Sequence, residues 1–124
     1  MLYPNRGRLA TRRLYSLERS ILTKIPALNV ELPMVQVRAL AVHIWEAERV
    51  PKALPTVVAG RGTPDGGGAL VSYCESGRVE LCKGQRNRLV LIHELAHAIG
   101  DDREYDHGPA FCARYFYLLT KYGV

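Results

Sequence analysis

The stretch NRLVLIHELAHAIG, residues 87–100, decides how the chain is organised. Asn87 is a good N-cap and Gly100 a natural stop, so one helix is expected between them. Apolar side chains lie on nearly every face of that helix, which is typical of a helix buried inside a domain. Three residues break the apolar pattern, and each needs a partner if it is buried: His93, Glu94 and His97.

The spacing of these three residues, HExxH, predicts a metal site. Residues four apart on a helix lie one turn apart on the same face, so His93 and His97 can reach one ion. Glu94 is displaced by about 100° around the helix axis and would lie beside the ion. That position suits a general base, which takes a proton from a water whose pKa zinc has lowered to about 7. We therefore predict a zinc cofactor held by both histidines, with Glu94 as the catalytic residue.

A catalytic zinc site needs a third protein ligand, and the residues after the second histidine offer several candidates. Arg103 stands where an HExxHxxGxxH protein has its third histidine, so that pattern does not apply. Asp101 lies just beyond the expected helix end, and Glu104 would make a glutamate-ligand site. His107 is the predicted ligand, because the intervening loop is long enough to turn back and Pro109 then starts a rigid helix.

The loop between the second and third histidines also contains candidates for supporting roles. Metal-bound histidines usually donate their other N–H to a carboxylate, so we expect acceptors among Asp101, Asp102 and Asp106. A solvated acidic loop is the alternative interpretation. Tyr105 is a candidate donor to an oxyanion or a packing residue. Neither His43 nor Cys112 is expected to take part: we interpret the first as a structural or surface residue and the second as a small buried one.

The rest of the chain predicts an α+β domain. Helices are predicted over 11–25, over 34–49 and from Pro109 onward. Strands are predicted over 56–60, 69–75 and 78–82, the last two joined by a tight turn. The first helix is expected to turn inward an apolar face formed by Leu14, Leu17, Ile21 and Ile25. The expected order is α-α-β-β-β-α-α, with a small antiparallel three-stranded sheet covered by helices.

Length and composition fit one globular domain over residues 1–124. Hydrophobic residues make up 48% of the chain and charged residues 23%, close to the globular average. The sequence has no apolar run of membrane-spanning length and no apolar N-terminal signal segment, so we expect no membrane partner. Three cysteines, odd in number and without a CxxC pair, argue against a disulfide framework. We therefore expect a reducing, cytoplasmic compartment.

The net charge of +5 comes from the N-terminal segment. Residues 1–25 contain six basic residues and one acidic residue, whereas residues 26–124 contain 11 of each. Clustered Lys and Arg bind phosphates, so nucleic acid is a candidate partner, with residues 1–12 as a flexible basic arm. A solvated helix face explains the same charges, and we favour that simpler interpretation.

HELAHAIG followed by HGPAF resembles the zincin metallopeptidases, especially the small SprT-like domains, in which a third histidine opens a helix after HExxH. Together with RRLYSLE, these segments are also similar to a family of short bacterial and phage metallohydrolases. The resemblance implies a minimal zincin-like domain with His93, His97 and His107 as zinc ligands and Glu94 as the base. It also implies a peptide or protein substrate, aligned along an edge strand within 69–82.

Two other functions stay open at this point. Residues 97–107 are loosely similar to the histidine-rich stretch of the YbeY-type metal-dependent endoribonucleases. Those enzymes lack a glutamate after the first histidine, so Glu94 favours peptide-bond hydrolysis. The third function is that of a non-catalytic zinc-binding or regulatory module on the same scaffold. The identity of the substrate and the oligomeric state are not predicted.

Overall fold

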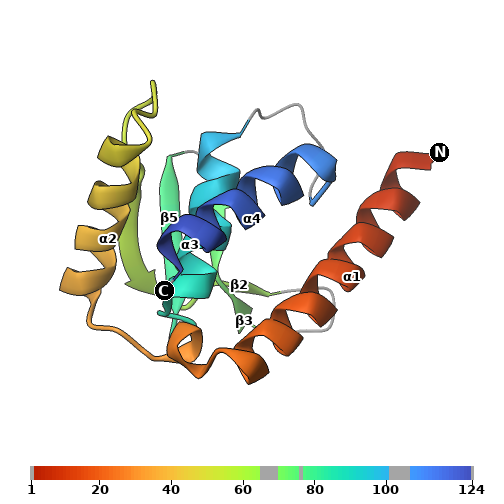
Figure 1. Cartoon of the computed structure of the whole chain (residues 1–124), viewed down its shortest axis with the longest axis horizontal. Helices are drawn as coiled ribbons and strands as arrows, with labels where there is room; N and C mark the ends of the chain where they lie inside the picture. The colour runs from red at the N-terminus through yellow and green to blue at the C-terminus, as the bar shows by residue number, and fades with distance from the viewer. Residues whose placement is uncertain (1, 65–69, 76, 101–106, 124) are drawn as a thin grey trace.

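The computed structural model describes residues 2–64, 70–75, 77–100 and 107–123, with the side chains of 2–10 and 70 left out (Figure 1). The described residues form an α+β domain, as predicted. Its elements are α1 (Leu2–Lys24), the 3₁₀ helix η1 (Pro26–Asn29), α2 (Met34–Ala47), β1 (Thr56–Gly60), β2 (Thr63–Pro64), β3 (Leu70–Val71), β4 (Tyr73–Glu75), β5 (Arg78–Cys82), α3 (Arg88–Ile99) and α4 (Pro109–Tyr122).

The three-stranded sheet has the order β1-β5-β4 and is mixed. β4 pairs antiparallel with β5, with Cys74 opposite Val79, as the tight turn between them predicts. β1 runs parallel to β5, with Val57 opposite Val79. The prediction of an antiparallel sheet is therefore wrong for β1. Alternating apolar residues indicate a strand but not its direction, and the intervening segment carries the chain back so that β5 starts beside the start of β1.

The turn-rich segment after β1 leads into a second, short ladder. β2 pairs antiparallel with β3, with Thr63 opposite Val71. The strand that we expected over 69–75 is divided at Ser72 into β3 and β4. The Ser72 hydroxyl accepts a hydrogen bond from the Cys82 N–H at 3.0 Å. The backbone N–H of Ser72 donates to Gln85 Oε1 at 2.9 Å. Side-chain bonds thus replace the backbone ladder where the strand is divided.

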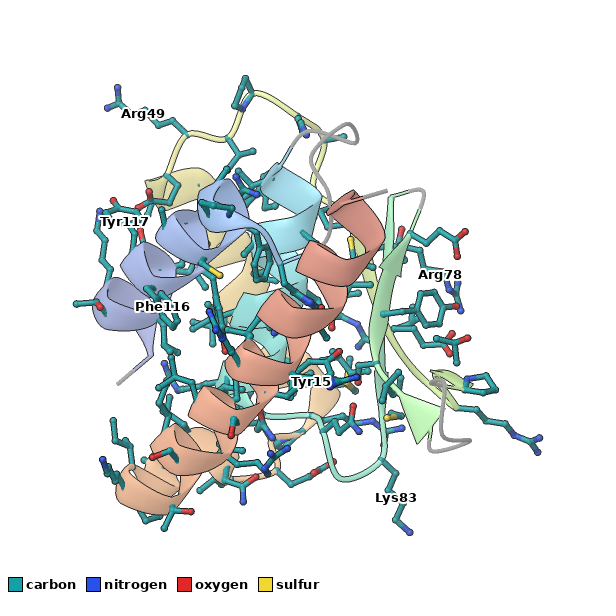
Figure 2. The ribbon with its side chains drawn as sticks, turned by 90° about the vertical axis from the view of Figure 1, so that its right-hand side faces the viewer. Tyr15, Arg49, Arg78, Lys83, Phe116 and Tyr117 are labelled. Carbon is teal, nitrogen blue, oxygen red and sulfur yellow. The ribbon has the colours of Figure 1, made fainter. Side chains whose placement is uncertain are left out.

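The helices cover one face of the sheet (Figure 2). α2 packs on β1, and α3 packs on β4 and β5. Val79 and Leu81 of β5 are fully buried in the core shared with these helices, whereas Arg78 points away from them on the other face. α3 and α4 lie between α2 on one side and α1 on the other (Figure 1). The central position of α3 explains why it is apolar on nearly every face.

Both ends of α3 agree with the sequence prediction. The Asn87 side chain accepts a hydrogen bond from the Val90 N–H at 2.9 Å, and the helix ends at Ile99, before Gly100. The Lys52 ammonium donates to the Gly100 carbonyl at 2.6 Å, so a positive charge satisfies a backbone acceptor at the helix C-terminus. Seven residues of α3, including His93 and Glu94, are buried.

α1 differs from its prediction in extent and in the face that it turns inward. It begins at Leu2 rather than at residue 11, so the backbone of the segment that we expected to be a basic arm is helical. Leu14 is buried, but Leu17 is 45% exposed and Ile25 39% exposed, whereas Glu18 is only 9% exposed.

Among the helices that the structure describes, none combines the length and the apolar character needed to cross a membrane.

Two glycines in turns provide a matched test of this topology. Gly62 and Gly77 have the same left-handed backbone, with φ of +78° and +77°. A Cβ on Gly62 would lie 2.3 Å from the Val71 carbonyl oxygen, whereas a Cβ on Gly77 would meet nothing within 4 Å. We expect Gly77→Ala to lower the free energy of unfolding by about 1 kcal/mol, from the backbone conformation alone. Gly62→Ala should lower the free energy of unfolding clearly more than Gly77→Ala does, because β3 must also move to make room for the methyl group. If urea unfolding gave the same loss for both variants, the close approach of Gly62 to Val71 would be contradicted.

Candidate metal centre

Three histidines from two parts of the chain meet at one point. His93 and His97 lie one turn apart on α3, and His107 lies just before α4, which begins at Pro109. The Nε2 atom of His107 is 3.1 Å from Nε2 of His93 and 3.3 Å from Nε2 of His97. His93 and His107 are buried, and His97 is partly buried. The three residues predicted as ligands therefore form a group that can hold a metal ion.

The separations between these nitrogens fit a metal site better than a set of hydrogen bonds. In a tetrahedral site with metal–nitrogen bonds of 2.0–2.1 Å, two ligand nitrogens are about 3.3 Å apart. A proton on Nε2 of His107 can lie along one of its two short N···N lines but not along both. A cation between the rings satisfies all three lone pairs at once. The distances between the three histidine nitrogens thus fit the coordination of a divalent metal ion.

The backbone at His107 is part of how the site is assembled. His107 has φ +57°, in the left-handed region that non-glycine residues rarely adopt. Its side chain is 3% exposed, and its carbonyl oxygen accepts a hydrogen bond from the Cys112 thiol at 3.5 Å. Such a conformation persists only where the surrounding contacts hold it, and it clusters at functional sites. The turn brings the imidazole back onto α3 immediately before α4 begins.

Two of the three histidines have their second ring nitrogen held by α1. The Nδ1–H of His93 donates to Glu18 Oε2 at 2.7 Å, and Nδ1 of His107 is hydrogen-bonded to the Thr11 hydroxyl at 2.7 Å. The Tyr115 hydroxyl of α4 donates to the same Glu18 oxygen at 2.6 Å. Because a carboxylate accepts only, the proton of neutral His93 lies on Nδ1, and its Nε2 lone pair faces the other histidines.

These partners were not identified from the sequence. The predicted acceptors, the alternative ligands and the candidate oxyanion donor Tyr105 lie outside the described residues, which leave out Asp101, Asp102, Glu104, Tyr105 and Asp106. Tyr115 is a core residue as predicted, but its hydroxyl also contacts Glu18. One sequence feature pointed to α1: Glu18 is the single acidic residue among the first 25.

Burial and neighbouring charges set the protonation of the groups around the site. Burial above all, and after it the electrostatic influence of His93, His107 and Arg114, lowers the pKa of His97 to about 3. His97 is therefore neutral, which is the form that binds metals. Burial and the negative charge of Glu18 raise the pKa of the Cys112 thiol. The raised pKa favours the protonated thiol. Cys112 is only partly buried, whereas we expected a buried residue.

Glu94 is buried on α3 next to the first histidine, with an exposed fraction of 7%. Burial, together with the negative charges of Glu18 and Glu94, raises the pKa of Tyr115, so the phenol stays protonated and can donate to Glu18.

In the described residues the ligand group consists of the three histidines alone, without a carboxylate. The fourth histidine, His43, is exposed on α2 with its ring against Tyr122, away from this group.

Comparisons with protein-family models, with curated proteins and with solved structures find no match for this chain. The similarity of HELAHAIG and HGPAF to the zincins therefore stays a prediction from the sequence.

Removal of one imidazole tests the metal centre directly. Wild-type protein, purified without a metal-affinity step, should contain about one divalent ion per chain by mass spectrometry. His107→Ala should lose most of that metal, because two histidines one turn apart remain without the ligand that faces both. His43→Ala removes a histidine outside the group and should keep the wild-type content. If His107→Ala bound metal as tightly as wild type, the third ligand would be Asp101 or Glu104.

Proposed function

We propose that this chain is a zinc-dependent hydrolase that cleaves peptide bonds, with the metal held by His93, His97 and His107 and with Glu94 as the general base. The observation that carries the proposal is the convergence of three imidazole nitrogens, with separations of 3.1 and 3.3 Å from Nε2 of His107. A site with three protein ligands and an open fourth position is typical of catalytic rather than structural zinc.

The chemistry of the ligands favours zinc or another transition metal over calcium, magnesium and manganese. Imidazole suits zinc, copper, iron and nickel, whereas calcium, magnesium and manganese prefer oxygen ligands. Three histidines without a thiolate or carboxylate among the described ligands form a neutral set, so the bound ion keeps its charge of +2. Such a charge in a partly buried site acts strongly on any group that binds beside it.

When bound, zinc supplies a Lewis acid that makes water more acidic and polarises a carbonyl oxygen. In the proposal, the Glu94 carboxylate accepts the proton of the attacking water and passes it to the leaving amine. Glu18 and Thr11 hold the His93 and His107 rings by Nδ1, so that Nε2 of each would be available to hold the metal. Tyr115 stays protonated and keeps Glu18 in place by its hydrogen bond.

The edge of the sheet supports a peptide as the substrate. In the order β1-β5-β4, β4 is an outer strand, and no further strand pairs with it in the described part of the chain. α3, which carries both the base and two of the histidines, packs against β4. An extended peptide can add to such an edge through main-chain hydrogen bonds. This arrangement agrees with the substrate position that the resemblance to the zincins implies.

The substitution Glu94→Gln tests the proposed base. It keeps the shape of the side chain but removes its ability to accept a proton, so turnover should fall by about 10²- to 10⁴-fold. Zinc content should stay at the wild-type level, because Glu94 is outside the ligand group. The measurement is cleavage of a fluorogenic peptide library and of labelled casein by zinc-loaded protein. Glu46→Gln, the same change at an exposed position on α2, is the control and should keep full activity.

The same assay separates the two alternative functions when labelled RNA is included. Metal-dependent cleavage of RNA without cleavage of peptides would replace the peptidase by an endoribonuclease. Zinc binding without cleavage of either substrate would favour a binding or regulatory module. Full activity of Glu94→Gln on peptides would remove Glu94 from the mechanism while leaving the metal in place.

A further inference from the structure

We infer that Glu18 is a positioning residue of the metal centre, and that through it the docking of α1 and the binding of metal are coupled. The inference rests on the metal site of the proposed function but not on its hydrolytic activity. It assigns a role to a helix that the HExxH motif does not include.

The orientation of α1 is not explained by hydrophobic burial. Thr11, Leu14 and Glu18, at helical spacings of three and four, lie on its inner face, and two of these three are polar. Tyr15 is 43% exposed and Leu17 45% exposed on the same helix. Of the α1 side chains that the structure describes, only those of Leu14 and Glu18 are buried. The hydrophobic effect alone would turn Leu17 inward and leave the carboxylate in water.

The buried carboxylate is instead paired with groups of the metal centre. One oxygen of Glu18 accepts hydrogen bonds from His93 Nδ1 at 2.7 Å and from the Tyr115 hydroxyl at 2.6 Å. His93 is separated from Glu18 by 75 residues in the chain and Tyr115 by 97, so these contacts exist only when α1 is docked. Figure 2 shows α1 passing in front of α3. The orientation of α1 therefore depends on the metal centre.

A metal ion bound at Nε2 of His93 would strengthen the hydrogen bond between Nδ1 of the same ring and Glu18. A cation at Nε2 draws electron density from the imidazole, so Nδ1–H becomes a stronger donor to the Glu18 carboxylate. In return, the carboxylate makes the imidazole a better ligand and fixes the direction of its lone pair. Because the linkage is reciprocal, the factor by which α1 docking improves metal affinity equals the factor by which metal favours docking.

The closing experiment measures zinc affinity by competition with a chromogenic chelator. Glu18→Gln keeps the shape and an acceptor oxygen but removes the charge, and we expect about 10-fold weaker binding; Glu18→Ala removes the contact and should approach 100-fold. Glu46→Gln makes the same change of charge at an exposed site, and Arg19→Ala changes an exposed residue next to Glu18. Both controls should bind zinc as wild type does.

Two further readouts separate positioning from a merely structural role. Cobalt(II) in place of zinc should show a visible absorption band that differs between wild type and Glu18→Gln, because the His93 ring is held differently. Hydrogen exchange in residues 11–24 should slow on addition of zinc to wild type, and this slowing should be smaller in Glu18→Gln. If Glu18 had only a structural role, Glu18→Gln would change the protection of residues 11–24 from hydrogen exchange equally with and without metal. The cobalt band would then be the same in the variant and in wild type.

The outcomes distinguish this inference from the proposed hydrolase. Wild-type affinity and an unchanged cobalt band in Glu18→Gln, with α1 protection independent of metal, would overturn the inference while the zinc site stands. Weakened binding in Glu18→Gln without hydrolysis by any variant would support the inference and overturn the peptidase. Wild-type protein that binds no zinc would overturn both. If Glu18→Ala did not fold, Glu18→Gln would decide, because it preserves the side-chain volume.

Discussion

The meeting of three imidazole nitrogens within a few ångströms is the constraint on which the rest of this structure depends. Two of them come from a helix that is buried because apolar residues surround them on nearly every face. The third reaches the helix only through a left-handed backbone at His107, immediately before α4 begins. The two distances from Nε2 of His107 match those between ligands of one tetrahedral metal ion, so the packing of α3, the turn and α4 forms a group of three histidines that can bind a metal ion.

Polar groups around the histidines are connected through the carboxylate of Glu18. Glu18 accepts hydrogen bonds from both His93 and Tyr115. Burial, and after it the charge of Glu18, raises the pKa of the Tyr115 phenol and of the Cys112 thiol. Fully paired networks of this kind rigidify a buried site, whereas a network with one partner missing costs stability. The N-terminal helix is thereby part of the site, although 75 residues separate Glu18 from the first histidine.

How much could be predicted from the sequence depends on the range of the interaction. The bounds of α3, its N-cap at Asn87 and the placement of His93 and His97 on one face follow from local spacing, and the structure confirms them. Two predictions were wrong. β1 pairs parallel with β5, where we expected an antiparallel sheet, and α1 turns Glu18 inward, where we expected Leu17. In both cases the local pattern is compatible with two arrangements, and contacts with distant residues select one of them.

The sequence by itself determined that a buried helix presents two histidines and a glutamate at metal-ligand spacing, because helical geometry relates residues four apart without reference to the rest of the chain. It also pointed to His107, because Pro109 sets where the next helix starts. Only the tertiary structure decided that the His107 ring returns to α3 and that Glu18, Thr11 and Tyr115 surround the histidines. These contacts join segments far apart in the chain, and such pairings depend on the packing of the whole domain rather than on any local pattern.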